Sequence, residues 1–458
     1  MSSPHTGADA ARAIARAGGE PEWLERWRLA GWETYASQPL PDRVSHLWRY
    51  TEPAKFLTSK VSPVVPSGSG ASGGASDDGP KAFAAAASES SPPGLAAERS
   101  EELAGLLIQE DTTTATVELG RKWKEAGVIL SDLPTAVQLH PDLVEQYLGK
   151  TVPSEQGKFA GLNAALFNGG VFLYVPAGVE LDLPVSTLFR SSQDLSAVFP
   201  RTLLVLEEGA AATLIDEYGT SPRAAGNGAA PRVIAHAVVE GHVGRNANLQ
   251  YVNVQNWGCR TRSHYTQRLH VDRDGSVVSV GIGLGGLYNK ADIGTELQGA
   301  NANSEMIGVL FGDGRQHFDN HTEHIHVHSH TFSDLDFKVV LEDRSRSAYT
   351  GLIRIELDAT NSEAYQENRN LLLDSECRAE SIPELEILNQ EVRCTHGATI
   401  GPIDDEQVFY LMTRGLSRRE AERAIVEGFF APVMDRIGDA TLKERLWSYI
   451  RAKLQARR

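Results

Sequence analysis

The sequence predicts a mainly β protein with helical ends, in which a β-helix core lies between an N-terminal and a C-terminal helical region. The main observation is the stretch 159–403, where short apolar or alternating runs follow one another, separated by turn residues, with almost no helical periodicity. An all-β stretch of this length must remove its sheet edges by stacking, closure or coiling. Small residues and Asn recur through it, as the tight corners of a solenoid require, which favours an irregular β-helix over a sandwich.

The rest of the chain divides by composition and periodicity. Residues 8–37 carry apolar side chains three and four positions apart and end before Pro39-Leu-Pro41, which predicts helix. Ser, Gly, Ala and Pro dominate from Val61 onward, and this composition cannot bury enough apolar area to offset chain entropy. The predicted segments are an N-terminal helical region (1–60), a flexible linker (61–98), a mixed helical connector (99–158), the β-helix core (159–403) and a C-terminal helical arm (404–458).

Composition predicts a soluble, cytoplasmic protein with a sizeable core. Of 458 residues, 41% are hydrophobic and 23% are charged. The net charge of -16 argues against nucleic acids and anionic membranes as partners, because both need a basic surface. Cys259, Cys377 and Cys394 are too few for a disulfide framework or a four-cysteine zinc module, which is typical of a reducing compartment. The N-terminus lacks an apolar signal-peptide core, and no run reaches the length of a membrane span.

The segment around Cys394 and His396 is a candidate for metal or sulfur chemistry. Side chains two apart on a strand project from the same face, so a thiol and an imidazole would lie side by side. We expect the adjacent base to raise the thiolate fraction of Cys394, and Gly397 to let another chain or ligand approach closely. Two ligands cannot complete a tetrahedral site, so further donors would come from elsewhere, including a partner protein. Cys259 and Cys377 are expected to be small buried hydrophobes.

A second candidate is the run of histidines between 317 and 330. On a continuous strand, His324, His326, His328 and His330 would share one face, where they could bind zinc, iron or copper. Glu323 could complete a cupin-like site. The alternative is a polar ladder along a lightly buried sheet face. Both interpretations are consistent with the sequence.

The residues Leu148-Gly-Lys-Thr151 are similar to the end of a phosphate-binding P-loop. That motif needs a glycine five positions before its Gly-Lys pair, and Val144 stands there. The preceding residues are also helical in pattern, whereas a P-loop follows a strand. We therefore predict that the chain does not bind ATP itself.

The tail predicts amphipathic helices. Gly415 is a natural helix end, and Ser417-Arg-Arg-Glu420 has the pattern of a capping box that opens the next helix. The apolar side chains exceed what a short helical arm can bury by itself. Packing on the β core and docking into a groove of another protein are equally favoured alternatives. The apolar residues concerned are Phe409, Tyr410, Phe429, Phe430 and Val433.

Several segments in collinear order resemble the SufB/SufD family, the scaffold subunits of the SUF iron–sulfur cluster assembly system. They cover most of the chain outside the linker. These segments are Pro39–Pro41, Trp48–Thr51, Phe159–Pro176 with Gly178, Asp319–Thr322, Ser347–Ile353, Cys394–Gly401 and Asp404–Gly415. Where the SufB branch usually carries Glu-His-Glu-Ala, this chain has Cys394-Thr-His396-Gly-Ala398, which resembles the SufD branch. A SufB-like role is the alternative.

The resemblance implies a right-handed parallel β-helix that pairs with the paralogue SufB through its last strands and docks the ABC-type ATPase SufC on its C-terminal helices. Clusters would then be built at the SufB–SufD interface, with His396 and Cys394 on this side and the main cysteine ligand on SufB. The isolated chain is expected to hold no tightly bound cofactor, and the interface a transient iron–sulfur cluster or iron. The residues implied in SufC docking are Glu406, Phe409, Tyr410, Arg414, Gly415, Phe429 and Phe430.

We therefore predict a non-enzymatic scaffold subunit. The alternative from another class is a cupin-like, metal-dependent enzyme that uses His324, His326 and Glu323, with His328 as a further ligand.

Overall fold

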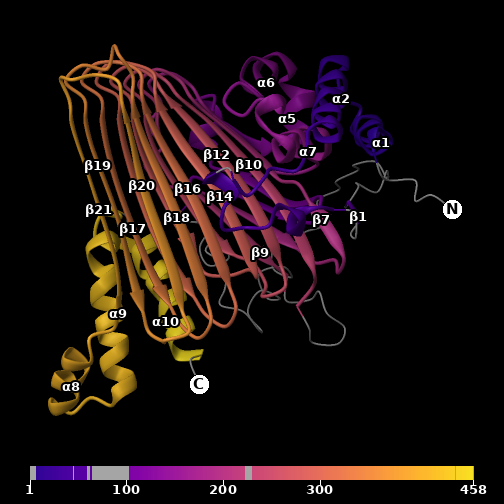
Figure 1. Ribbon diagram of the computed structural model, residues 1–458. Helices are drawn as coiled ribbons and strands as arrows, with labels where there is room; N and C mark the ends of the chain where they lie inside the picture. The colour runs from indigo at the N-terminus through magenta and orange to yellow at the C-terminus, as the bar shows by residue number, and fades with distance from the viewer. Residues whose placement is uncertain are drawn as a thin grey trace.

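Two long β-sheets, stacked face to face, form the centre of the molecule in the computed structural model (Figure 1). The structure describes residues 7–44, 46–58, 62–63, 103–221, 230–438 and 440–456. Most of the predicted linker 61–98 lies outside the described residues, and only the short strand β1 (Ser62–Pro63) falls within it.

The strands form a β-solenoid of about eight turns. From β8 onward, successive strands alternate between the two sheets, so each turn of the chain adds one parallel strand to each sheet. Sheet A contains β4 (Ile129–Asp132), β5 (Val171–Val175), β8 (Arg201–Leu206), β10 (Val233–Val243), β12 (Arg262–Val271), β14 (Tyr288–Leu297), β16 (His317–His326), β18 (Arg346–Ile355) and β20 (Arg378–Ile387), with β1 and β7 (Ser196–Val198) alongside. Sheet B contains β3 (Thr113–Leu119), β2 (Gly105–Glu110), β6 (Val185–Ser191), β9 (Ala211–Thr220), β11 (Asn248–Asn256), β13 (Ser276–Gly283), β15 (Asn303–Gly312), β17 (Phe332–Leu341), β19 (Glu363–Leu372) and β21 (Arg393–Pro402). The predicted class, a parallel β-helix core with helical ends, is confirmed.

The repeat is uneven, which explains why the sequence shows no strict period. Tyr288 pairs with His317 and His317 with Arg346, so these two turns each span 29 residues. Arg346 pairs with Arg378, which lies 32 residues further on. The strands have similar lengths, whereas the corner loops differ in length. Equivalent side chains of successive turns are aligned by the sheet hydrogen bonds and not by a fixed spacing in the sequence.

One row of corners is built by residues in the left-handed conformation. Each connection from sheet A to sheet B between β10 and β19 contains one residue with a φ of 56 to 62°. Asn and Asp tolerate this conformation better than other residues with a Cβ, because their short polar side chains bond to the local backbone. The recurring Asn of the sequence therefore marks the corners, as predicted. The corner residues are Asn246, Asp274, Asn301, His330 and Asn361.

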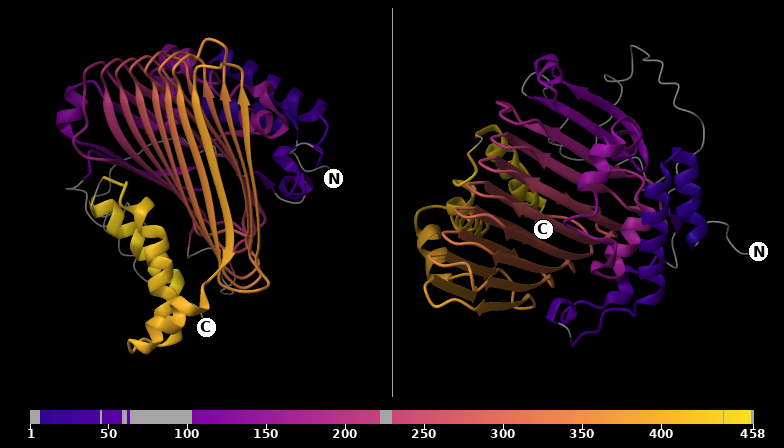
Figure 2. Two further views of the ribbon diagram at one scale, coloured as in Figure 1. Left: turned by 60° about the vertical axis from the view of Figure 1, so that its left-hand side comes forward. Right: turned by 90° about the horizontal axis from the view of Figure 1, so that it is seen from above.

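Helices cover the outer faces of both sheets. The N-terminal group is α1 (Ala8–Gly18), α2 (Glu22–Ser37), η1 (His46–Trp48), η2 (Pro53–Phe56), α5 (Leu133–Leu139), α6 (Pro141–Tyr147), η4 (Ser154–Gln156) and α7 (Lys158–Leu166). Helix α4 (Arg121–Glu125) does not belong to it, because Trp123 packs with the interior apolar cluster. The C-terminal group is α8 (Asp405–Thr413), α9 (Arg418–Met434) and α10 (Ala440–Ala456). Figure 2 shows the two groups on opposite sides of the solenoid. Among the described residues, no helix has both the length and the apolar character that crossing a bilayer requires.

The segment limits seen in the structure differ in detail from those of the sequence. Helix α7 occupies the first residues of the segment 159–403, and the first parallel strand of sheet A begins at Val171. Strands β2, β3 and β4 lie within 99–158 and join the two sheets. Short strands flanked by helices are hard to separate by periodicity alone, since each offers too few residues to set a period.

Two segments that carry the family resemblance meet on the outer face of sheet A. The ring of Trp48 stacks on His264 with centroids 5.5 Å apart. The Thr51 hydroxyl donates to Asp319 Oδ2 at 2.5 Å, and the buried ammonium of Lys290 donates to Asp319 Oδ1 at 2.8 Å. The N-terminal region is therefore fastened to the middle of the solenoid by a buried, charge-assisted hydrogen-bond network.

Candidate functional site at the open end of the solenoid

In the described part of the chain, no strand or helix caps the last turn of the solenoid. Strands β20 and β21 each have a single strand neighbour among the described residues, and both lie at the free edge in Figures 1 and 2. On β21 the inward row continues the buried row of β19 in register. The pairs are Ala364 with Cys394, Gln366 with His396, Asn368 with Ala398 and Asn370 with Ile400. The interior of the solenoid is consequently open to its surroundings at this end.

His396 lies in this inward row and is exposed. Its neighbour Gly397 faces outward, because a Cβ there would approach Tyr365 and Glu367 on the outer side of β19. Alternation along the strand then places His396 on the inner side. Within the described part of the chain, the imidazole makes no hydrogen bond and no ion pair. The ring is therefore free to accept a ligand from a second surface.

Cys394 lies two residues earlier on the same inward face, as predicted. It packs beside Leu385 against the buried cluster of the preceding turn. This cluster consists of Ile353, Ile355, Ala359 and Ala364. Burial among these apolar groups raises the pKa of the thiol to about 11. The expected rise in thiolate fraction is therefore wrong for the chain alone, since desolvation favours the neutral thiol.

The same edge carries exposed apolar side chains. Ile387 on β20 and Ile400 on β21 are 41% and 47% exposed, although their strand neighbours Ile355 and Asn370 are buried. Unpaired strand edges offer a row of backbone N–H and C=O groups to another chain. Apolar side chains and unpaired backbone groups thus occur together around Cys394 and His396.

The other cysteines differ from each other. Cys377 is buried, as predicted. Cys259 lies in the loop between β11 and β12 and is exposed, so the expectation that it is buried is wrong. The loop places it outside the alternation of the strands, where no sheet face shields it.

The histidine run does not form one face, because strand β16 ends at His326. His328 lies in the following turn, and His330 takes the left-handed corner conformation. His324 and His326 point into the solenoid, where burial lowers their pKa values to about 4 and about 3. Glu323 alternates to the outer face, 3.8 Å from Arg268. The predicted ligand set is therefore not brought together.

Serine and threonine hydroxyls surround the two buried imidazoles. His324 Nε2 lies 3.0 Å from Ser304 Oγ. His326 has a hydroxyl at each nitrogen, with Thr331 Oγ1 at 2.8 Å and Ser333 Oγ at 2.9 Å. Both rings thus cross-link sheet A to sheet B as neutral groups.

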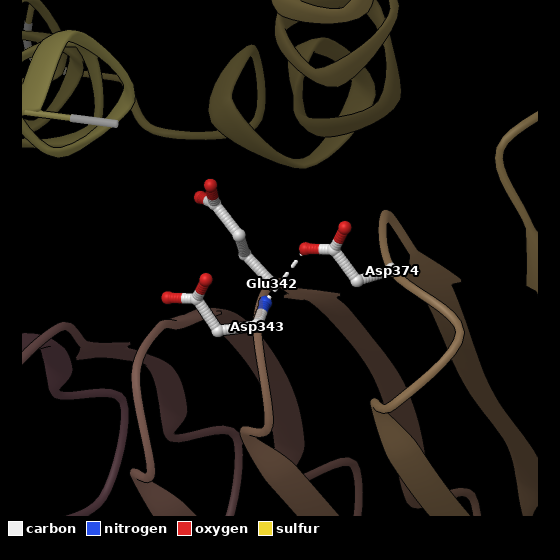
Figure 3. Close-up of side chains that lie close together, drawn as sticks. All are labelled: Glu342, Asp343 and Asp374. Carbon is white, nitrogen blue, oxygen red and sulfur yellow. Dashed lines mark hydrogen bonds between the residues drawn. The ribbon is translucent and has the colours of Figure 1, made fainter. Parts of the chain in front are cut away.

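The structure also contains a cluster of three acidic side chains that the sequence did not predict. Figure 3 shows Glu342, Asp343 and Asp374 at the corners of two successive turns. Their ligand atoms all lie within 4.8 Å of one another. The backbone N–H of Asp343 donates to Asp374 Oδ2 at 2.7 Å, which links one corner to the next. Asp343 is itself in the left-handed conformation, so this contact stabilises a tight turn.

The residues similar to a P-loop end are held by a buried carboxylate. The backbone N–H groups of Gly149, Thr151 and Val152 donate to the two oxygens of Glu240 at 3.1 to 3.3 Å. Arg201 Nη2 donates to the same carboxylate at 2.5 Å, and both side chains of this ion pair are fully buried. The amides that would bind a phosphate in a P-loop are already paired. Sequence reasoning missed this Arg201–Glu240 pair, because the two residues lie in unremarkable strands.

The C-terminal arm combines the two predicted alternatives. Helices α9 and α10 pack on the outer face of sheet B, and Phe430 is fully buried there with Phe429 packed beside it. Both phenylalanines pack on the chain's own β core, and Phe430, which is fully buried, offers no surface for docking. Phe429 is only partly buried, so its predicted role in docking stays a prediction.

Helix α8 is different, because it projects away from the sheets (Figure 1). Phe409 and Tyr410 are 69% and 56% exposed. The Arg414 guanidinium lies 5.0 Å from the centre of the Tyr410 ring, and Gly415 ends the segment with a φ of 96°. Glu406 is exposed on the same helix. Five of the predicted docking residues therefore share one exposed helix and its end.

The described residues thus define a parallel β-solenoid protein with a Cys–His pair on the inward face of its last strand. The family model of the SUF system FeS cluster assembly SufBD core domain matches residues 189–429, and that of the SufBD protein N-terminal region matches residues 108–187. The chain belongs to the SufBD family of iron–sulfur cluster assembly proteins.

Curated relatives agree with this family. The iron–sulfur cluster assembly protein SufD of Bacillus subtilis is 28% identical over 447 residues, which cover 95% of each chain. An iron–sulfur cluster assembly SufBD family protein of Staphylococcus haemolyticus is 28% identical over 434 residues, 92% of this chain and 87% of the relative. A SufBD family protein of Staphylococcus aureus is 28% identical over 426 residues, with the same coverage.

Proposed function

We propose that this chain is a non-catalytic scaffold subunit of the SufD type, which pairs with a SufB-type paralogue and docks a SufC-type ATPase. The observation that carries the proposal is the uncapped end of the solenoid, where the free edges of β20 and β21 surround an incomplete donor pair. Iron–sulfur clusters are the cargo of this end and are not a resident cofactor of the chain.

Pairing at the open end follows from its chemistry. A second solenoid of the same family would continue both sheets by adding one strand to each free edge. Such addition satisfies the backbone groups of β20 and β21 and covers the exposed side chains of Ile387 and Ile400. Both effects act at the same place, so the partner closes the interior of the solenoid over Cys394 and His396.

Cluster assembly there needs donors from both chains. Cys394 offers a sulfur and His396 an imidazole nitrogen, and both are ligand types that iron accepts. A Cys394 thiol with a pKa of about 11 must lose its proton to bind iron, and a nearby ferrous or ferric ion supplies the charge that makes this favourable. The remaining donors belong to the partner.

Helix α8 is the proposed contact for the ATPase. Exposed aromatic residues next to an arginine are typical of the centre of a protein interface. Phe409, Tyr410 and Arg414 form such a group, with Glu406 and Gly415 on the same segment. Because α9 and α10 are fixed to sheet B, movement of α8 by the ATPase would be transmitted to the solenoid through the arm.

The site is tested in a complex made by co-expression with a SufB-type and a SufC-type partner. We expect the wild-type complex to acquire iron–sulfur absorbance, and His396→Ala to assemble normally but to lose most of it. Thr395→Ala is the control, since Thr395 is the exposed neighbour on the outer side of the same strand. Equal cluster content in the His396→Ala and Thr395→Ala complexes would refute the assignment.

The docking contact is tested separately. Phe409→Ala should weaken ATPase binding by about 2 kcal/mol if the ring is a central contact. Leu139→Ala is the matched control, because Leu139 is 68% exposed on α5 in the other helical group. Isothermal titration of the ATPase into each variant measures the difference. An effect of the same size at both positions excludes α8 as the docking helix.

A further inference from the structure

A buried amide lies directly beside His396 in the inward row. Gln366 on β19 is the register partner of His396 and is fully buried. Its Nε2 donates across the interior to the carbonyl of Gly351 at 3.1 Å. Its Oε1 has no hydrogen-bond partner among the described residues. A buried acceptor without a partner is destabilising, because it loses its hydrogen bonds to water and gains none in return.

The amide is held in this orientation by close packing. A Cβ at residue 351 would clash with the Tyr349 hydroxyl and with Gln366 Nε2, so glycine is required for the two polar groups to approach. Tyr349 is in turn fixed by the hydroxyl of Thr322 at 2.8 Å. With Nε2 committed to sheet A, Oε1 cannot exchange places with it without losing that bond.

The imidazole of His396 is the donor that could satisfy Gln366 Oε1. Strands in a sheet lie about 4.8 Å apart, and in-register side chains on the same face of parallel strands are direct neighbours. A histidine that binds a metal through one ring nitrogen almost always donates its other N–H to an acceptor, which fixes the tautomer and the ring orientation. In the chain alone His396 is exposed and makes no such bond within the described residues.

We propose that Gln366 is a positioning residue for His396: its Oε1 accepts the ring N–H of His396 when the opposite ring nitrogen binds iron. This inference rests on the proposed function of the open end and adds to it the acceptor that selects the tautomer. Closure of the interior by the partner restricts the ring to the inward row, where Gln366 is its neighbour on β19. The hydrogen bond then replaces contact of the ring N–H with water.

A second buried amide provides the comparison. Asn370 Oδ1 also has no partner among the described residues, and Asn370 is 4% exposed. Its register partner on β21 is Ile400, whose side chain has no hydrogen to donate. Asn370 therefore has the same burial and the same kind of vacant acceptor, but no ligand beside it. Gln366 is distinguished by its position next to His396.

The experiment compares Gln366→Met with Asn370→Leu in the complex with both partners, each change replacing an amide by an apolar group of similar size. Reconstitution with ferrous iron and sulfide at limiting iron measures the iron concentration for half-maximal cluster formation. We expect Gln366→Met to raise this concentration about 10- to 100-fold and Asn370→Leu to change it less than about twofold. Pulsed EPR of the reduced cluster should show a defined histidine nitrogen coupling in wild type that becomes weaker or heterogeneous only in Gln366→Met.

Two further results separate this inference from the proposed function. If His396→Ala removes the cluster while Gln366→Met behaves like Asn370→Leu in both readouts, the role of Gln366 is wrong and the scaffold function stands. If His396→Ala also has no effect, the proposed function itself fails. A measurement without substitutions covers the case in which Gln366→Met does not fold. In the wild-type complex, ¹⁵N NMR of His396 should show a single tautomer with a slowly exchanging ring N–H, and a rapidly exchanging ring N–H overturns the inference.

Discussion

The two ends of the solenoid are finished in different ways. At the first end, β3 and β4 run antiparallel to their neighbours β2 and β5, and the interior behind them is filled by a large apolar cluster that includes Trp123 and Leu130. At the last end, β20 and β21 continue the parallel repeat and stop, which leaves the inward side chains of His396 and Ile400 exposed. The chain therefore closes its own interior at the first end, and the last end is the one at which we propose that a second subunit binds.

The largest expected effect comes from the closed part of the solenoid, where the buried Arg201–Glu240 pair on β8 and β10 holds the loop between α6 and η4. Glu240→Ala leaves the Arg201 charge buried without its partner and frees three backbone N–H groups, which should cost about 3–5 kcal/mol of the free energy of unfolding. Chemical denaturation of the full chain measures it. Glu208→Ala is the control, because Glu208 pairs with Arg245 at the surface, where solvent screens the charges and the pair contributes little to stability. Similar losses in the two variants would mean that the buried pair has no special role in stability.

The next prediction compares apolar side chains of the inward rows directly. Leu214 on β9 is fully buried, and Leu214→Ala should cost about 2–5 kcal/mol through lost burial and a cavity. Ile400→Ala removes a side chain that is 47% exposed, so it should cost less than about 1 kcal/mol in the chain alone. Thermal or urea unfolding of both variants tests the difference. A large loss at Ile400 would show that the last turn is already part of the cooperative core without a partner.

Hydrogen exchange tests whether the open end becomes like the closed one on pairing. In the chain alone, amides of β20 and β21 should exchange through local opening at much lower free energy than those of β8 or β11 in the centre of the sheets. A partner present at about 100 times its Kd should raise the free energy of opening of these edge amides by up to about 2.7 kcal/mol. Amides of β4 at the other end are the internal reference. If the partner slowed hydrogen exchange at β4 and not at β21, it would bind at the first end of the solenoid, which contradicts the prediction.

The fold could be predicted from the sequence because the solenoid repeats a local signal. Strand length, turn residues and the recurring Asn can each be recognised within a single turn of the solenoid. The corner residues Asn246, Asn301 and Asn361 are examples. The limits of the segments were harder to predict from the sequence, because α7 and β2 to β4 are short elements whose type depends on their neighbours. Corner loops of unequal length also hid the repeat itself.

The candidate site could be predicted only as far as alternation along one strand allows. Cys394 and His396 share a face because they are two apart, and this required no knowledge of the fold. The prediction for the histidine run used the same alternation and was wrong for His328 and His330, because the strand ends at His326. Contacts between distant turns, such as Gln366 beside His396 and Glu240 beside Gly149, depend on the sheet register. No local pattern encodes that register.

The smallest predicted effect concerns the ionisation of Cys394. Burial raises its pKa from the ordinary 9.0 to about 11, so the folded state disfavours the thiolate relative to the unfolded chain. The contribution of this thiol to stability is therefore complete below pH 9 and declines as the pH rises from 9 toward 11. Alkylation of Cys394 in the chain alone should accordingly reach half its limiting rate near pH 11, as mass spectrometry of the modified peptide can measure.

The exposed thiol of Cys259 reports on the reagent in the same sample, and Cys394→Ser identifies the peptide without ambiguity. Half-maximal alkylation of Cys394 near pH 9 would mean that its apolar neighbours at the open end do not desolvate it. In the paired complex, a bound iron should protect the sulfur from alkylation across the whole range, because the metal takes the place of the proton. The open end would then differ from the closed end in one further respect, because the Cys394 thiol would lose its proton when the second subunit and the iron bind.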